Sequence, residues 1–309
     1  AQERAARVYH AQETHFLING STVGILSAIL GTTKRGDRIL VARNCHKSVY
    51  HAIYMNELRP VYLYPEFDER HQINGEISAL AVEKALEEEP SIRAVVIVSP
   101  TYDGVVSDVG AIAGAVHRKG IPLIVDEAHG AHFGFHPYFP ENSNQKGADV
   151  VIHSLHKTLP SLTQTALLHM NGELVNRVQI RKYLHMLQSS SPSYVLMAGI
   201  DSCIRLLAEG ASGLFEPYVS ALERTRLELG ELAHLRLEST KNYDCSKILI
   251  STGDTGITGK ELYETLLKEY HLQMEMKAGA YVLAMTSPGD TEEGLERLVH
   301  ALFQIDERL

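Results

Sequence analysis

Short apolar runs alternate with longer amphipathic stretches through the first two thirds of the chain. The apolar runs have the length of buried strands, and they occupy residues 15–18, 38–42, 60–64, 93–98, 121–125, 150–152 and 165–170. Amphipathic spacing predicts helices between them, at residues 2–12, 23–30, 49–57, 78–88, 111–119 and 173–187. This alternation predicts βαβ units with right-handed crossovers. We therefore expect an α/β fold with a mostly parallel, seven-stranded type of sheet and helices on both faces.

The pattern changes beyond two long helical stretches at residues 194–209 and 214–235. Strands are expected there at 247–250, 272–276 and 281–285, and amphipathic helices at 259–270 and 291–305. These elements predict a second, smaller α+β domain. We place a large domain at residues 1–211 and the small domain at residues 212–309.

Polar residues collect directly after the predicted strands. The clusters occupy residues 19–22, 44–46, 99–104, 126–129 and 154–157. In an open α/β sheet, the carboxyl ends of the strands form the edge where ligands bind. Five clusters on one edge predict a ligand site there.

The first two clusters allow both a functional and a structural interpretation. Gly20, Ser21 and Thr22 stand between a strand and a helix, where backbone N–H groups and hydroxyls favour a phosphate. Because the motif is short, taken alone it is more typical of an ordinary helix N-cap at Ser21 or Thr22. His46 also lies at a strand-to-helix turn, where it could stack on an aromatic ring or simply cap the helix.

An acid and a lysine end two neighbouring apolar runs. Asp126 follows the run 121–125, and Lys157 lies shortly after the run 150–152, in a stretch whose proline and hydroxyl residues suit a loop. A lysine amine can attack an aldehyde, and a carboxylate can hold a protonated pyridine nitrogen. Together with the turn at Gly20–Thr22, the pair predicts a pyridoxal 5′-phosphate (PLP) site. His46 or His129 would pack against the ring, and Ser154 and His156 would join Ser21 and Thr22 at the phosphate.

Two other catalytic centres fit the sequence less well. Asp126, His129, His132 and His136 could bind zinc, but a metal would leave the lysine and the phosphate-type turn without a role. The chain has no Gly-x-Ser-x-Gly elbow, which argues against a serine hydrolase of that kind. We expect no metal.

Bulk properties narrow the class of protein. The 309 residues carry a formal net charge of -9, which argues against a nucleic-acid or anionic-membrane surface. The three cysteines have no CxxC spacing, so a reducing cytoplasm is expected. No apolar run approaches the ~18 residues of a membrane span, and the N-terminus has no signal-peptide pattern. Residue 1 is Ala and a helix is already predicted from residue 2, so we expect the chain to start within a domain.

Several motifs together resemble the Orn/Lys/Arg decarboxylase family of fold-type I PLP enzymes. They are DEAHGAH at residues 126–132, SLHKTLPSLTQ at 154–164, NCHKS at 44–48, SPTYDG at 99–104 and SSSPSY at 189–194. The version in this chain is similar to the shorter bacterial arginine/lysine decarboxylases, and the resemblance covers nearly the whole chain.

The resemblance implies a role for each motif residue. Lys157 would form the Schiff base, Asp126 would pair with the pyridinium nitrogen, and His46 would stack on the ring. Ala128 and His129 would line its surroundings. The phosphate ligands would be Ser21, Thr22, Ser154 and His156. The implied reaction removes the α-carboxylate of arginine, lysine or ornithine as CO₂ and leaves a diamine or polyamine, which would make the protein a lyase of polyamine biosynthesis.

The resemblance also implies a second subunit. A hydroxyl near Ser190 would reach the phosphate of a neighbouring copy, so we expect a homodimer or higher homo-oligomer with the active site at the interface. Family members carry a segment before residue 1 and a domain after Leu309, and we expect both to be lacking in this chain. Two alternatives therefore stay open: a catalytically incomplete PLP-binding or regulatory relative, and another fold-type I enzyme such as an aminotransferase or lyase.

Overall fold

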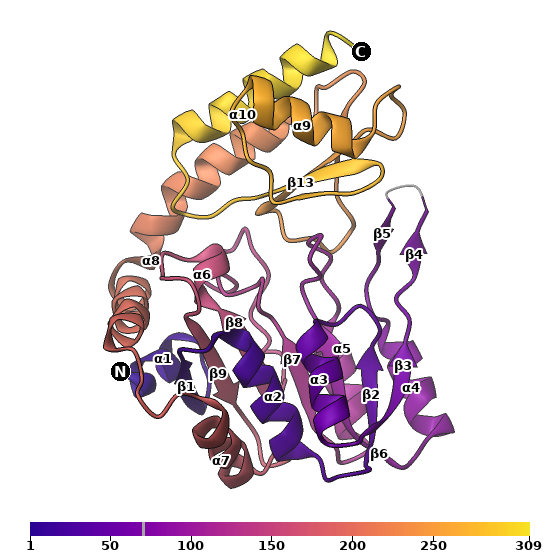
Figure 1. Cartoon of the computed structure of the whole chain (residues 1–309), viewed down its shortest axis with the longest axis vertical. Coiled ribbons are helices and arrows are strands. Elements are labelled where there is room, and N and C mark those ends of the chain that lie inside the picture. Colours follow the sequence, from indigo (N-terminus) through magenta and orange to yellow (C-terminus); the bar gives the residue numbers. More distant parts are fainter. Residues whose placement is uncertain (70–71) are drawn as a thin grey trace.

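One large sheet organises the first part of the chain. The computed structural model describes residues 1–69 and 72–309, and within them seven strands pair in the spatial order β1-β9-β8-β7-β6-β2-β3 (Figure 1). In chain order these strands are β1 (Glu13–Leu17), β2 (Arg38–Ala42), β3 (Arg59–Leu63), β6 (Ile92–Val98), β7 (Leu123–Asp126), β8 (Val150–Ser154) and β9 (Ala166–Met170). Neighbouring strands pair in parallel along the order β3-β2-β6-β7-β8, whereas β9 is antiparallel to both β8 and β1. The expected mostly parallel sheet is confirmed.

Helices cover both faces of this sheet. On one face lie α2 (Gly20–Thr32), α3 (Lys47–Met55) and α7 (Arg177–Leu187), which share a buried apolar cluster with the strands. On the other face lie α4 (Ala79–Glu88) and α5 (Val109–His117), together with α1 (Gln2–Val8) and the first half of α8 (Tyr194–Leu229). Because alternate strand residues point to opposite faces, each strand contributes side chains to the apolar clusters on both faces of the sheet. This explains why the strands read as continuous apolar runs.

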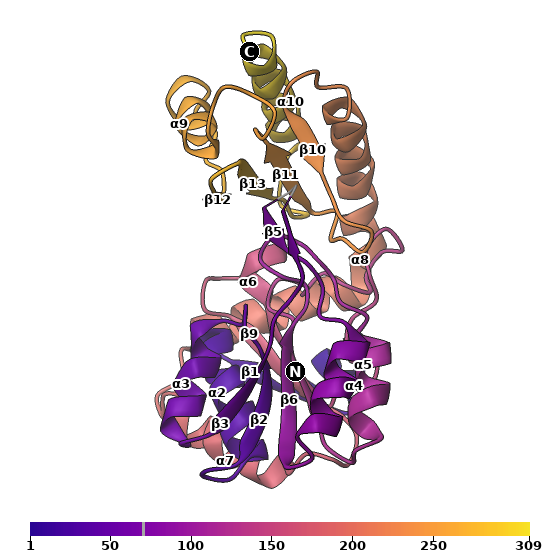
Figure 2. The same ribbon diagram turned by 90° about the vertical axis from the view of Figure 1, so that its right-hand side faces the viewer.

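A smaller sheet lies over the carboxyl-terminal edge of the large one (Figure 2). Its strands pair antiparallel in the order β10-β11-β13-β12. They are β10 (Arg236–Glu238), β11 (Lys247–Ser251), β12 (Met276–Lys277) and β13 (Tyr281–Met285), and the accompanying helices are α9 (Gly259–Glu269) and α10 (Glu292–Asp306). Helix α8 connects the part of the chain with the large sheet to the part with the small sheet, and its backbone is non-helical at Gly210. The boundary at residue 211 stays our proposal, and this break stands next to it.

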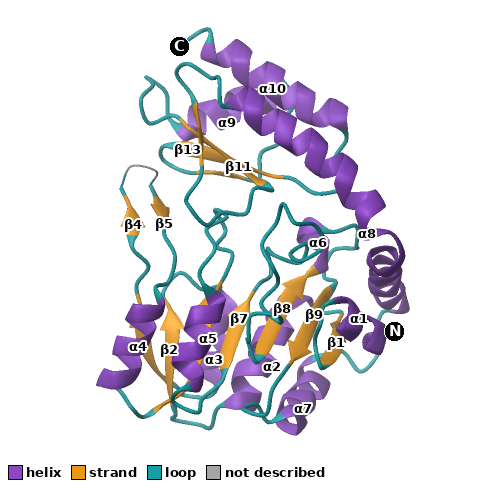
Figure 3. Cartoon of the chain, turned by 180° about the vertical axis from the view of Figure 1, so that it is seen from behind, coloured by secondary structure: helices purple, strands orange, loops and turns teal. Residues whose placement is uncertain are grey.

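Several expected elements differ from the structure. Two short antiparallel strands that were not predicted, β4 (Phe67–Asp68) and β5 (Ile73–Asn74), lie between the predicted strand at 60–64 and the predicted helix at 78–88, and residues 70–71 between them are outside the described residues. The expected strand at 272–276 is wrong, because only Met276–Lys277 pairs with β13, and β10 was missed. Lys157 lies in a four-residue helix, α6 (Leu155–Thr158), instead of a loop (Figure 3). In the part of the chain that the structure describes, no helix is both long and apolar enough to cross a membrane.

Candidate cofactor site

A cavity of about 460 Å³ opens at the carboxyl edge of the large sheet. Each of the five polar clusters found in the sequence contributes to its wall. The lining residues are Asn19, Gly20, Ser21, Thr22, Asn44, His46, Val98, Tyr102, Asp126, Ala128, His129, His156, Lys157, Thr163 and Gln164. Parallel strands bring these residues together because their ends share one edge.

Lys157 projects into this cavity from α6. Its Nζ atom lies 2.8 Å from Nε2 of His129. Burial lowers the pKa of the Lys157 ammonium, and the negative charges of Asp126 and Glu275 oppose this shift. A lysine with a lowered pKa holds more of the neutral amine, which is the form that attacks a carbonyl.

Asp126 is the last residue of β7 and is buried at the floor of the cavity. Burial raises the pKa of its carboxyl group, whereas the charge of Lys157 and a hydrogen bond from the Ala128 backbone N–H, at 3.2 Å, act in the other direction. Such a carboxyl group favours a cationic partner over water. A protonated ring nitrogen is a partner of this kind.

The N-terminus of α2 opens onto the same cavity. Its N-cap, Asn19, makes no side-chain hydrogen bond to the helix, and Gly20 adopts a φ of 76°, which favours glycine. The Gly20 backbone N–H donates to the Gln164 carbonyl oxygen at 3.0 Å, so this turn is tied to the loop that follows α6. Uncapped N–H groups at Ser21 and Thr22, with two hydroxyls beside them, suit a phosphate. The turn predicted at Gly20–Thr22 is therefore the first turn of a helix that begins at Gly20.

Two histidines from distant parts of the sequence, His46 and His129, line the cavity. His46 caps α3, where its Nδ1 atom accepts from the Ser48 backbone N–H at 3.3 Å, and its ring still lines the cavity. His129 is buried, and burial together with the charges of Lys247 and Lys157 holds its pKa well below the usual value. The Tyr102 ring packs on His129 with a centroid distance of 4.9 Å. Both histidines are therefore placed to contact a ring held near Lys157.

Three predicted residues are placed less directly. His156 lines the cavity, and its Nδ1 atom lies 3.0 Å from the Thr165 carbonyl oxygen. The Ser154 hydroxyl is buried and has no hydrogen-bond partner among the described residues. A buried hydroxyl without a hydrogen bond destabilises a fold, unless a bound ligand or water forms the missing bond. Ser190 is exposed and lines a separate hollow with Gln188 and Pro192.

The geometry does not favour the zinc alternative. His132 pairs with Asp244 at 3.0 Å and His136 with Glu216 at 3.5 Å, and neither histidine lines the cavity that contains Asp126. Among the described residues, no group of three or more His, Cys, Asp or Glu side chains could hold a metal ion.

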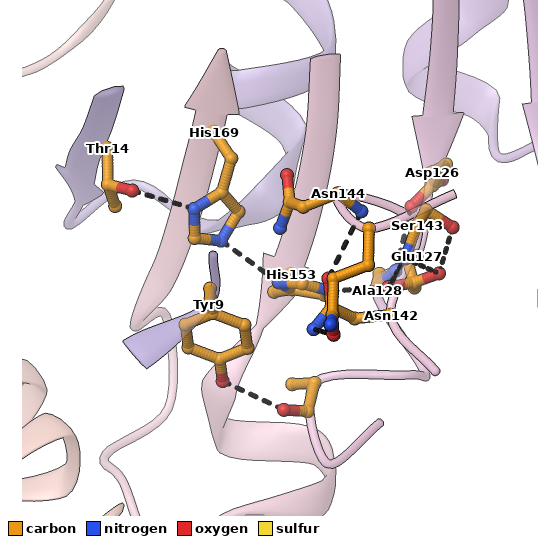
Figure 4. A network of polar contacts seen from close by, with 12 residues as sticks. Tyr9, Thr14, Asp126, Glu127, Ala128, Asn142, Ser143, Asn144, His153 and His169 are labelled. Atoms are coloured by element: carbon orange, nitrogen blue, oxygen red, sulfur yellow. Dashed lines mark hydrogen bonds and ion pairs between the residues drawn. The ribbon is translucent and has the colours of Figure 1, made fainter. Parts of the chain in front are cut away.

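A buried polar ladder crosses the sheet beneath the site (Figure 4). The Thr14 hydroxyl lies 2.8 Å from Nδ1 of His169, whose Nε2 lies 3.0 Å from Nδ1 of His153. His153 contacts Glu127, which also accepts from the backbone N–H and hydroxyl of Ser143. Sequence reasoning missed this ladder, although Glu127 and His153 both interrupt apolar runs next to predicted site residues.

Lys247 is the second residue that sequence reasoning missed. It begins β11 in the small sheet and is fully buried, with Nζ 3.0 Å from Nδ1 of His129. The only available signal was a lysine at the head of the apolar run 247–250. Nothing in the local pattern indicates that this run faces residue 129.

Comparison with known proteins gives one family over almost the whole chain. The model for "Orn/Lys/Arg decarboxylase, major domain" matches residues 1–291. The chain is 35% identical to an arginine decarboxylase of Bacillus cereus over 98% of its length and 67% of that protein, and 32% identical to the one of Bacillus subtilis over 100% and 65%. The chain thus spans about two thirds of these relatives.

Solved structures show the same fold. The lysine decarboxylase LdcF of Francisella novicida superposes with a TM-score of 0.86 at 21% sequence identity, covering 99% of this chain and 50% of that one. The fold is that of the fold-type I PLP-dependent enzymes, with a mixed sheet of seven strands between helices.

Proposed function

Because the chain belongs to the Orn/Lys/Arg decarboxylase family, we propose that it binds PLP through Lys157 and decarboxylates a basic amino acid. One observation carries the proposal. Lys157, Asp126 and the uncapped start of α2 line a single cavity, with a nucleophile, an acid and an anion site at separate places on its wall.

The residues present suit PLP at both of its ends. The phosphate would bind the first turn of α2 at Gly20, Ser21 and Thr22, with His156 as a further group that lines the cavity. Ser154 does not line the cavity, and we propose it as a supporting ligand because its buried hydroxyl has no hydrogen-bond partner among the described residues. The pyridine nitrogen would face Asp126. His46, Ala128 and His129 would surround the ring, with His46 and His129 as its packing partners.

The chain's own groups would orient the reaction and control protons. Bound PLP would supply an electron sink for the pair left on Cα when CO₂ departs. Asp126 would keep the ring nitrogen protonated, because a buried carboxylate is best compensated by a cation. Lys157 would hold the cofactor through its amine and would serve as a proton donor or acceptor next to Cα of the substrate.

Arginine is the first substrate to test. The relatives at 35% and 32% identity are named arginine decarboxylases, whereas the lysine decarboxylase LdcA of Pseudomonas aeruginosa is 28% identical. A cationic substrate also needs an acidic group near the cavity. Glu275 of the small domain accepts a hydrogen bond from the Tyr102 hydroxyl, and its negative charge opposes the lowering of the pKa of both Lys157 and Lys247. We propose Glu275 as the acid that attracts the distal end of the substrate.

The proposal includes a second copy of the chain. Ser190 is exposed and lies outside the cavity of its own chain, as a residue that serves a neighbouring subunit would. Three free cysteines accord with a reducing cytoplasm, which we propose as the compartment.

A spectroscopic experiment and an activity experiment test the proposal. Purified protein mixed with PLP should turn yellow, and borohydride should fix the cofactor covalently. Lys157→Ala should abolish both signals, whereas Lys34→Ala, which changes an exposed lysine, should leave them unchanged. A covalent adduct that survives in Lys157→Ala would show that the anchor is another residue.

CO₂ release should then be measured with arginine, lysine and ornithine. Release from any of the three supports the decarboxylase assignment. A chain that binds PLP through Lys157 but releases no CO₂ would instead be a PLP-binding relative without this activity.

A further inference from the structure

One imidazole ring bridges two lysines that lie far apart in the sequence. Nε2 of His129 lies 2.8 Å from Nζ of Lys157, and Nδ1 of the same ring lies 3.0 Å from Nζ of Lys247. Lys157 belongs to the large sheet's edge and Lys247 to the small sheet. His129 is therefore the link between the proposed cofactor amine and a cation supplied by the other domain.

The backbone fixes Lys247 in this position. Its N–H donates to the Asp244 carbonyl oxygen at 3.0 Å, and its own carbonyl oxygen accepts from Arg226 at 2.9 Å. The stem of the side chain packs on Gly104, where an added Cβ would approach Cγ of Lys247 to 2.9 Å. A fully buried lysine held this closely is a built part of the site, because an ordered surface lysine would keep its ammonium in water.

Charges around the bridge determine which groups carry protons. Burial lowers the pKa of Lys247 to about 8, and Asp244, Glu275 and Asp103 limit the fall, so the ammonium form still prevails at neutral pH. His129 has a pKa well below the usual value and is neutral. A neutral imidazole has one nitrogen that donates and one that accepts.

We propose that the Lys247 ammonium donates to Nδ1 of His129 and thereby holds the single imidazole proton on Nε2, directed at the Lys157 nitrogen. Lys247 is thus a positioning residue that acts through His129. Nε2–H can donate only to a nitrogen with a free lone pair, so it favours the neutral amine of Lys157 over the ammonium. The inference depends on the proposed function only where it names Lys157 as the amine that bonds PLP.

Other titratable groups near the ring do not replace this contact. The groups that face His129 are Lys157 and His156 from α6, Lys247 from β11, His132 from its own loop, and the Tyr102 ring. Of these, only Lys247 contacts Nδ1 within the described part of the chain. His132 is engaged by Asp244.

Nitrogen NMR on the full-length apoprotein tests the proton position directly. With ¹⁵N-labelled histidine, and His129→Gln to assign the signal, His129 should show a protonated Nε2 and an unprotonated Nδ1 at neutral pH. A protonated Nδ1 would overturn the proposal. This measurement needs neither PLP nor substrate, so it stands even if the proposed function fails.

A variant tests the consequence for Lys157. Lys247→Met removes the charge and keeps the length of the side chain, and Lys277→Met makes the same change at an exposed lysine of the small domain. The rate of PLP uptake by the apoprotein should rise with pH as Lys157 loses its proton. In Lys247→Met the midpoint of this rise should move up by about one pH unit, because a nearby cation is lost. In Lys277→Met it should stay at the wild-type value.

The possible failures are distinguishable. If the wild-type chain takes up no PLP, the proposed function is wrong and the NMR result alone decides the inference. If the wild type takes up PLP and folded Lys247→Met has an unchanged midpoint, the inference is wrong while the proposed function stands.

Discussion

Nε2 of His153 lies 2.7 Å from Oε1 of Glu127, and this contact joins the strand before Lys157 to the residue after Asp126. Both side chains are almost completely buried. They lie on the face of the sheet opposite to Asp126, so the polar ladder supports the site from behind without touching the cavity.

Glu127→Ala should destabilise the protein strongly. The change leaves His153 and the N–H and hydroxyl of Ser143 without their buried acceptor, which costs about 3 kcal/mol or more in unfolding free energy. Glu127→Gln keeps one oxygen acceptor and should lose less. Urea denaturation of the apoproteins measures both. Equal midpoints for Glu127→Ala and the wild type would contradict a supporting role for the ladder.

Ser21→Ala and Thr22→Val should weaken PLP binding while leaving the fold intact. Each change removes one hydroxyl from the anion site at the start of α2, and a hydrogen bond to a charged group is worth about 1.5–3 kcal/mol, or roughly tenfold or more in affinity. Titration of the apoprotein with PLP gives the dissociation constants. Thr32→Val changes a buried, unpartnered hydroxyl at the other end of the same helix and should bind PLP normally.

Glu275→Gln should raise KM for the basic substrate with little change in kcat. The negative charge of Glu275 acts on the pKa of Lys157 and Lys247. Glu275 is nevertheless exposed and contacts the Tyr102 hydroxyl, and it does not line the cavity that holds the proposed reacting atoms. Loss of binding shared by ground state and transition state appears in KM. Initial rates of CO₂ release separate the two parameters, and Glu264→Gln serves as an exposed acid of the same domain. A fall in kcat alone would argue against a substrate-attracting role.

The buried pair of His132 and Asp244 should make stability depend on acid. Burial alone would raise the pKa of Asp244, but the charge and hydrogen bond of His132, together with Lys247 and Ser246, lower the pKa below its usual value. A lowered pKa stabilises the fold above the unfolded value of about 3.9, and this contribution is lost as the pH falls through the folded value.

Asp244→Asn should therefore cost about 2 kcal/mol at pH 7, where an uncompensated buried partner remains. The gap to the wild type should close as unfolding is measured at pH values below about 4. Asp254→Asn, which alters an exposed partner of Arg236, provides the comparison. A gap that is constant from pH 7 to pH 3 would show that Asp244 does not titrate with a lowered pKa.

Local pattern was sufficient to predict the parts of the site that lie along the sheet's edge. Asp126 and Lys157 each follow a buried strand at short range, and parallel strands bring such positions together without further information. The same rule placed His46 and the turn at Gly20 on the cavity. The α/β alternation fixed the class of fold for the same reason.

Contacts between distant segments could not be predicted in this way. The contact between Lys247 and His129 joins residues 118 positions apart, and it depends on how the small sheet docks on the large one. The ladder at Glu127 depends on the register between β8 and β9, which periodicity does not give. The hairpin of β4 and β5 has strands of two residues, too short for an alternating pattern to appear.

The segment from Lys157 in α6 to Gln164 connects two parts of the cavity wall. One end carries the proposed covalent anchor, and the other end accepts a hydrogen bond from Gly20 at the proposed phosphate turn. A bound cofactor would thus be held at both of its ends by residues of one continuous segment of the chain. The separation between Lys157 and the proposed phosphate turn at Gly20 would be limited by this short segment. It would therefore stay the same if the small domain moved relative to the large sheet.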